Sequence, residues 1–229
     1  MKISKNKLNV VLDIGKTNVK LIFLKNDKIV KEYKTKQQNG SYRNSIKTLK
    51  SGKIIIWLIE KLKKESKKNI LENFVCTTHG CSLAFIGFDN KELIACTDYE
   101  YSFDKYKKEF LKVEPKFSTS FTPLLEGGLN TGLQIFYLSK KFPNVLKKTK
   151  YILSYPQYVA WKLSKTYSTE ITYVGCHSYL WDFKKNKYSQ LTKKLSVEKK
   201  FPPIKKAWDI IGDLKINNKK INILNGVHD

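Results

Sequence analysis

The sequence has almost no arginine. Arg43 is the only arginine among 44 basic residues, and the lysines are spread along the whole chain. A formal net charge of +24 is typical of a nucleic-acid-binding protein. Recognition of phosphates and base edges favours arginine forks, however, and no stretch of this chain concentrates them. We therefore attribute the charge to a compositional bias that also makes Asn and Ile abundant, and we expect no nucleic-acid partner.

Paired cysteines and long apolar segments are also missing. The four cysteines form no CxxC motif, which is typical of a reduced cytosolic chain, and no His or Cys spacing fits a metal site. Asp13 interrupts the only early apolar run, which argues against a signal peptide. The apolar run at residues 54–60 is too short to cross a membrane. We expect a soluble cytoplasmic protein with no membrane partner.

What the sequence does contain is a regular alternation of apolar segments. With 229 residues and 41% hydrophobic content, the chain can form one large domain or two small ones. The patterns predict strands at residues 8–14, 19–24, 28–36, 73–77, 82–88, 92–96, 150–154 and 221–227, and helices at residues 54–68, 133–142 and from Pro156 onward. Three strands in a meander, followed by alternating helices and strands, predict an α/β fold with a mixed central sheet.

The first strand ends in a lone carboxylate, Asp13, before a turn of small polar residues. In that turn Gly15, Thr17 and Asn18 can direct backbone N–H groups at an anion, and Lys16 adds an ammonium group. The Asp13 carboxylate is a ligand that Mg²⁺ accepts. The segment is not a Walker P-loop, because the glycine spacing is absent and a strand follows. The pattern indicates a phosphate site on a hairpin; the alternative is an ordinary hairpin whose aspartate caps the turn.

Six segments, in this order along the chain, resemble the FGGY family of carbohydrate kinases. They are VVLDIGKTNVKLIFL (10–24), TTHGCS (77–82), TDYE (97–100), YILSYPQYVAWKLS (151–164), EITYVGCHSYLWDF (170–183) and ILNGVHD (223–229). The resemblance implies a ribonuclease-H-like domain of the actin/hexokinase/Hsp70 ATPase type. The final His-Asp pair is similar to the rhamnulokinase and fuculokinase branch of the family.

The resemblance also implies roles at the phosphate end of a kinase site. Asp229 matches the family's catalytic aspartate, which accepts the proton of the attacking sugar hydroxyl. Phosphate binding falls to the turn residues Gly15, Lys16, Thr17 and Asn18. Asp13 would order Mg²⁺ beside ATP, so ATP and Mg²⁺ are the implied cofactors.

At the sugar end the implied ligands come from four segments. They are His79, Gly80, Tyr99, Glu100, Gln157 and His228. Two positions depart from the common family pattern: Thr77 and Thr78 precede His79, and Gln157 stands where the family usually has aspartate. These departures concern the identity of the sugar more than the reaction. The expected acceptor is a ketose such as L-rhamnulose, L-fuculose or a pentulose.

The family's second, nucleotide-binding lobe would follow Asp229. We therefore expect residues 1–229 to be an N-terminal sugar-binding lobe that is inactive, or nearly so, as a kinase on its own. Its expected partners are a sugar and the second lobe, with a homodimer left open. The alternatives are a non-catalytic sugar-binding or regulatory lobe, a basic nucleic-acid-binding module, and another branch of the ATPase superfamily.

Overall fold

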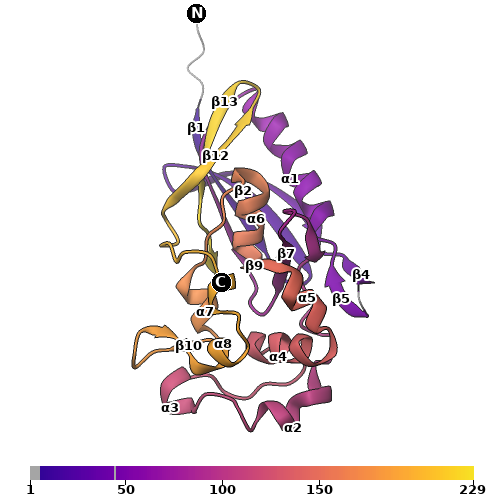
Figure 1. The fold of residues 1–229 in the computed structure, drawn as a ribbon. Helices are drawn as coiled ribbons and strands as arrows, with labels where there is room; N and C mark the ends of the chain where they lie inside the picture. Colours follow the sequence, from indigo (N-terminus) through magenta and orange to yellow (C-terminus); the bar gives the residue numbers. More distant parts are fainter. Residues whose placement is uncertain (1–5, 44) are drawn as a thin grey trace, which may run out of the picture.

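The computed structural model describes residues 6–43 and 45–229, and a mixed sheet forms its centre (Figure 1). Its strand order is β12-β13-β6-β1-β2-β3, with β14 also paired to β6. The strands are β1 (Lys7–Ile14), β2 (Asn18–Lys25), β3 (Lys28–Lys36), β6 (Ile70–Thr78), β12 (Ile210–Ile216), β13 (Lys219–Leu224) and β14 (Val227–His228). Strands β1, β2 and β3 pair antiparallel, whereas β6 runs parallel to β1, β13 and β14. The predicted meander and the mixed sheet are confirmed.

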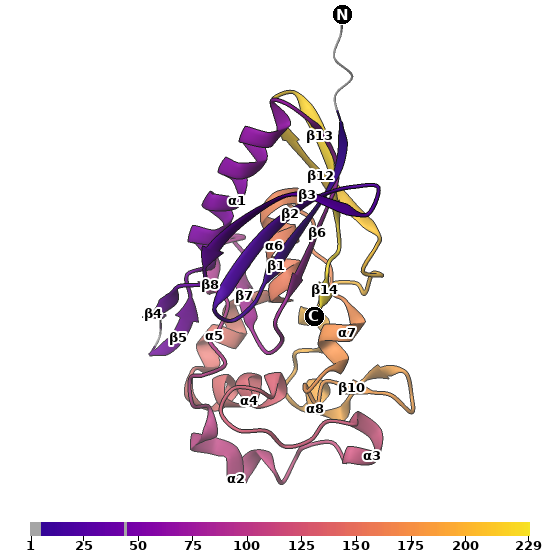
Figure 2. The same ribbon diagram turned by 180° about the vertical axis from the view of Figure 1, so that it is seen from behind.

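Two helices cover one face of this sheet. Helices α1 (Ser51–Ser66) and α6 (Tyr155–Ser164) lie on the same side in both views (Figures 1 and 2). Alternate residues of β1, such as Val10 and Leu12, are buried beneath them together with Leu58 and Val159. Apolar residues that alternate along a strand with a period of two are a pattern that predicts the strand from the sequence. We call these strands and the two helices the sheet region.

The second part of the molecule is built from short elements around its own apolar cluster. It contains a three-stranded sheet of β8 (Glu92–Ile94), β7 (Leu83–Gly87) and β9 (Thr149–Ser154). The helices are α2 (Lys107–Phe110), α3 (Phe117–Ser120), α4 (Thr131–Lys141), α5 (Pro143–Lys148), α7 (Ile171–Gly175) and α8 (Gln190–Lys194), with 3₁₀ turns at Asp104–Tyr106 and Glu198–Lys200. Two small hairpins, β4 (Asn39–Arg43) with β5 (Ile46–Leu49) and β10 (Trp181–Asp182) with β11 (Lys187–Tyr188), complete the chain. We call this part the helical region.

Several helices and strands begin or end at other residues than the sequence pattern predicts. The predicted helix at 54–68 begins at Ser51 and ends at Ser66, and the helix at 133–142 begins at Thr131. The predicted final strand is wrong in one respect, because β13 ends at Leu224 and β14 starts at Val227. Gly226 lies between them with φ +84°, and a Cβ there would stand 2.6 Å from the carbonyl oxygen of Cys76. Only glycine permits this close turn without strain.

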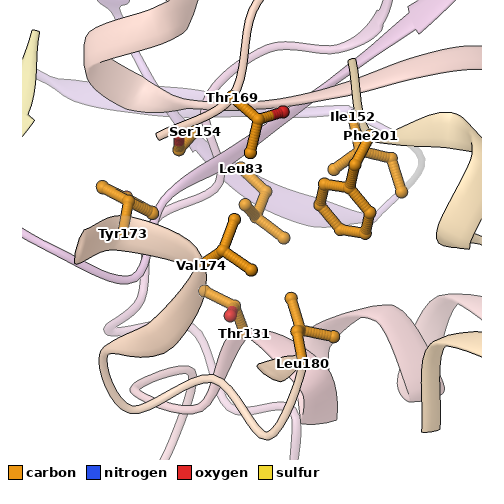
Figure 3. A pocket seen from close by; sticks show the side chains of 9 residues that line it. All are labelled: Leu83, Thr131, Ile152, Ser154, Thr169, Tyr173, Val174, Leu180 and Phe201. Atoms are coloured by element: carbon orange, nitrogen blue, oxygen red, sulfur yellow. The ribbon is translucent and has the colours of Figure 1, made fainter. Parts of the chain in front are cut away.

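A small cavity lies inside the helical region (Figure 3). Its volume is about 10 Å³, and its walls include Leu83, Ile152, Tyr173 and Phe201. This volume is about that of a single water molecule, so the cavity is too small for a sugar. Among the described residues, no helix is long and apolar enough to cross a membrane.

Candidate active site

Three strand ends meet at one edge of the central sheet. Ile14 of β1 is in register with Thr78 of β6, and Thr78 is in register with His228 of β14. The turn after β1 and the terminal Asp229 therefore lie at the same end of the sheet, on either side of β6 (Figure 2). Neighbouring strands are about 4.8 Å apart, so the ends of β1 and β14 are separated by roughly 10 Å. Both ends can therefore contact one small ligand that lies across the end of β6.

The turn after β1 is closed by backbone hydrogen bonds. The N–H of Gly15 donates to the carbonyl oxygen of Asn18 at 2.9 Å, and the N–H of Gln37 donates to that of Thr17 at 2.8 Å. The Asp13 carboxylate is one-third exposed and lies 3.7 Å from the ammonium group of its cross-strand neighbour Lys20. An accessible aspartate beside a tight turn fits the chemistry of a phosphate site with a bound cation.

The same aspartate is not part of a metal-binding cluster. Within residues 6–43 and 45–229, no group of three or more His, Cys, Asp or Glu side chains could hold a metal ion. A cation at Asp13 would need its other ligands from water and from a nucleotide. Mg²⁺ commonly binds in this way, through one or two carboxylates together with substrate phosphates.

Lys16 extends from the turn toward the loop at residues 97–100. Its ammonium group donates to the Asp98 carboxylate, lies 3.3 Å from Glu100 Oε2 and stands 4.6 Å from the centre of the Tyr99 ring. Lys47 of β5 contacts the same two carboxylates, at 3.0 Å and 3.7 Å. The predicted phosphate ligand Lys16 and the predicted sugar ligands Tyr99 and Glu100 are thus in direct contact.

Asp98 is the centre of this cluster. Its side chain is completely buried. Burial alone would raise its pKa, but hydrogen bonds from Lys16, from the N–H of Glu100 and from Lys47 outweigh burial and hold the pKa below its usual value. Sequence reasoning missed both Asp98 and Lys47. Asp98 stands inside the quoted TDYE segment, whereas nothing local distinguishes Lys47 from the chain's many other lysines.

His79 lies between the turn and Asp229. Its N–H donates to the carbonyl oxygen of Ile14 at 2.9 Å, and its imidazole packs edge-on against Tyr99 and Tyr155. Burial, assisted by the positive charge of Lys16, lowers the His79 pKa, so the ring is neutral at pH 7. Nδ1 lies 2.8 Å from the carbonyl oxygen of Gly80, which can only accept, so Nδ1 is assigned the proton. The Nε2 atom is buried and has no hydrogen-bond partner among the described residues.

Tyr99 and the chain end complete the site. Burial raises the pKa of the Tyr99 phenol, and the charges of Glu100, Asp98 and Asp229 act in the same direction. The N–H of Asp229 donates to the carbonyl oxygen of Thr78 at 3.1 Å. A Cβ at Gly80 would lie 2.3 Å from His228 Nε2. A residue with a side chain at this position would therefore clash with the His228 ring, and glycine leaves space for it.

Gln157 was expected to contact the sugar, and the structure gives its amide other partners. The side chain is completely buried. Its Nε2 donates to the carbonyl oxygens of Asn225 at 2.9 Å and Gly226 at 3.2 Å, while its Oε1 accepts from Ser154. Both N–H groups and the amide oxygen are therefore engaged within the protein. Gln157 holds the turn that precedes Asp229.

The solved structures that match the fold of this chain include carbohydrate kinases. A carbohydrate kinase from Novosphingobium aromaticivorans matches 99% of this chain with a TM-score of 0.90 and 25% sequence identity. This chain has the fold of a carbohydrate-kinase N-terminal half. A ligand-bound xylulose kinase and a gluconate kinase, both from Lactobacillus acidophilus, match 97% of this sugar-kinase-like lobe with TM-scores of 0.81 and 0.79 and identities of 16% and 15%.

The lobe spans about half the length of these proteins, since it covers 50%, 48% and 48% of their chains. No family model and no curated protein matches its sequence. The predicted fold class is confirmed. The rhamnulokinase and fuculokinase branch, in contrast, stays a prediction.

Proposed function

We propose that residues 1–229 are the sugar-binding lobe of an ATP-dependent carbohydrate kinase that transfers the γ-phosphate to a hydroxyl of a ketose. The observation that carries the proposal is the alignment of three strand ends, with the Asp13 turn, His79 and Asp229 at one edge of the sheet. Phosphoryl transfer needs a positioned hydroxyl and stabilisation of the transferring phosphate, and this edge supplies groups for both.

In the proposed reaction Asp229 accepts the proton of the attacking hydroxyl, which contributes roughly 10²–10⁴-fold to the rate. His79, which lies between the Asp13 turn and Asp229, is the side chain proposed to position the sugar relative to Asp229. The N–H groups and the Thr17 hydroxyl of the turn bind phosphate oxygens. Mg²⁺ held by Asp13 would neutralise charge on the nucleotide phosphates.

The adenine pocket is assigned to a second lobe that closes over this one. Closure excludes water and completes the site, so the 229-residue chain alone is expected to bind sugar without appreciable turnover. L-Rhamnulose, L-fuculose and the pentuloses are the ketoses proposed as acceptors.

Two experiments test the proposal. First, the chain is titrated calorimetrically with L-rhamnulose, L-fuculose, D-xylulose and D-ribulose; binding of at least one supports a sugar-binding lobe, and binding of none contradicts it. Second, the reading frame beyond codon 229 is sequenced, and the whole gene product is assayed for ADP release with the ketose that binds.

In the whole gene product, Asp229→Asn should lower kcat at least about 100-fold and leave KM nearly unchanged. Asp213→Asn is the control, because Asp213 is a partly exposed aspartate on β12 that forms an ion pair with Lys220, away from the candidate site. Sugar binding without ADP release by the whole product would instead indicate the non-catalytic alternative.

A further inference from the structure

A charged cluster beside the candidate sugar ligands joins three parts of the chain that are distant in sequence. Lys16 comes from the turn after β1, Lys47 from β5, and Asp98 and Glu100 from the loop after β8. Each lysine contacts both carboxylates. The two ammonium groups are therefore balanced by two carboxylates, and the cluster as a whole is neutral.

The two carboxylates differ in accessibility. Asp98 is completely buried, whereas the Glu100 side chain is 51% exposed. Both lysines are mostly covered, with side-chain exposures of 20% and 23%. Glu100 is therefore the most accessible charged side chain of the cluster, and both lysines already have anionic partners.

The cluster borders the groups assigned to sugar binding. The Lys16 ammonium stands over the Tyr99 ring, and Tyr99 packs against His79 with ring centres 5.3 Å apart. Asp229 follows β14 at the same end of the sheet, where its N–H donates to the carbonyl oxygen of Thr78, the residue before His79. Asp98, Glu100 and Asp229 thus place three carboxylates at this end of the sheet, against the two ammonium groups of Lys16 and Lys47. A carboxylate on the ligand would add a further negative charge to this surplus.

The fold by itself does not decide which sugars are accepted. The similar structures include a xylulose kinase, named for a neutral sugar, and a gluconate kinase, named for a sugar acid. We infer that Glu100, by occupying Lys16 and Lys47 and by adding its own half-exposed charge beside the candidate sugar ligands, makes this lobe select neutral sugars and reject sugar acids. The inference rests on the proposed sugar-binding function.

Selection of this kind works by repulsion rather than by an added attractive contact. A carboxylate within about 6 Å of Glu100 is disfavoured by roughly tenfold in affinity in a partly solvated pocket. Removing the Glu100 charge also leaves Lys16 and Lys47 with one carboxylate between them. The excess ammonium charge can then bind a ligand carboxylate.

The experiment is a pair of calorimetric titrations of the 229-residue chain, with the best-bound ketose and with the aldonate of the same carbon number. The wild type should bind the aldonate at least about 10-fold more weakly than the ketose. Glu100→Gln, which keeps a hydrogen-bonding oxygen, should strengthen aldonate binding relative to ketose binding about 5- to 10-fold. Glu100→Lys should strengthen it further.

Glu109→Gln is the matched control. Glu109 is also 51% exposed and pairs with one lysine, Lys140 at 3.0 Å, but it lies on α2. This variant should change neither affinity. Aldonate binding as tight as ketose binding in the wild type, or an unchanged aldonate affinity in Glu100→Gln, would overturn the inference and leave the sugar-binding lobe intact. If neither ligand class binds, the proposed function and the inference both fail.

Discussion

The sheet region and the helical region are held together in different ways. In the sheet region, alternate apolar side chains of β1 and β2 pack beneath α1 and α6. In the helical region, short helices are joined by buried polar side chains that bind distant backbone. Gln134 donates to the carbonyl oxygens of Cys81 and Gly128 and accepts from the Thr97 hydroxyl, while Asn130 bridges Pro123, Leu125 and His177.

The difference shows what each region needs in order to keep its shape. Hydrophobic burial is not directional, so a strand with the right period finds its place in a core. Short helices bury too little apolar surface to fix their own orientation, and a satisfied buried amide supplies the direction that burial does not. The candidate active site lies where the two regions meet.

The largest loss of stability is expected from truncation in the sheet region. Leu12 is completely buried in the main core, and Leu12→Ala should lower the free energy of unfolding by about 3–5 kcal/mol through lost burial and the resulting cavity. Urea unfolding followed by circular dichroism measures this. The control Ile29→Ala, at a side chain 62% exposed on β3, should change it by less than about 0.5 kcal/mol. Equal losses in the two variants would remove the contrast between buried and exposed strand positions.

A somewhat smaller loss is expected from an amide in the helical region. Gln134→Leu keeps the volume but leaves two carbonyl oxygens and one hydroxyl without their partner, which should cost about 3 kcal/mol. The exposed Gln190 provides the control Gln190→Leu, with an expected change below about 0.5 kcal/mol. If Gln134→Leu were as stable as the wild type in the same urea titration, directional bonding would not be what organises this region.

Gln157 lies on α6 of the sheet region but makes the kind of contact seen in the helical region. Gln157→Leu should destabilise the chain by about 2 kcal/mol and also weaken ketose binding, because the Asn225–Gly226 turn that carries Asp229 loses its two donors. Unfolding and calorimetric titration are measured on the same preparation. A loss of stability with unchanged sugar affinity would restrict Gln157 to a structural role.

The smallest expected effect is a change in pH dependence at the junction of the two regions. Burial lowers the pKa of His79, so the folded state keeps this ring neutral where the unfolded chain, with a pKa near 6.5, already binds a proton. The free energy of unfolding should therefore fall as pH drops from about 7.5 through 6.5 toward the folded-state pKa. Lys16 strengthens the shift, while Asp98 and Asp229 oppose it.

His79→Gln should remove this part of the pH dependence, and His177→Gln, at an exposed position, should retain it. Thermal unfolding at pH 7.5 and 5.5 for the wild type and both variants gives the comparison. Identical pH profiles for the wild type and His79→Gln would show that the ring is not held neutral by burial.

Sequence reasoning succeeded where the determining signal is local. The β1–turn–β2 hairpin, the α1 and α6 helices and the β7–β8 hairpin follow from periodicity and turn residues within single segments. It failed where the signal lies in partners far along the chain. The break between β13 and β14 depends on the approach of Gly226 to Cys76, and the partners of Gln157 are about 70 residues away.

The candidate site divides in the same manner. The sequence alone determined that a carboxylate and a polar turn end the first strand, and that His79 and Asp229 stand at the ends of two other predicted strands. Only the tertiary structure decided that these three ends share one sheet edge, that Lys16 and Lys47 meet at Asp98, and that Gln157 faces inward. The physical reason is that strand register and buried ion pairs depend on which segments become neighbours in space. The local periodicity of one segment does not specify its neighbours.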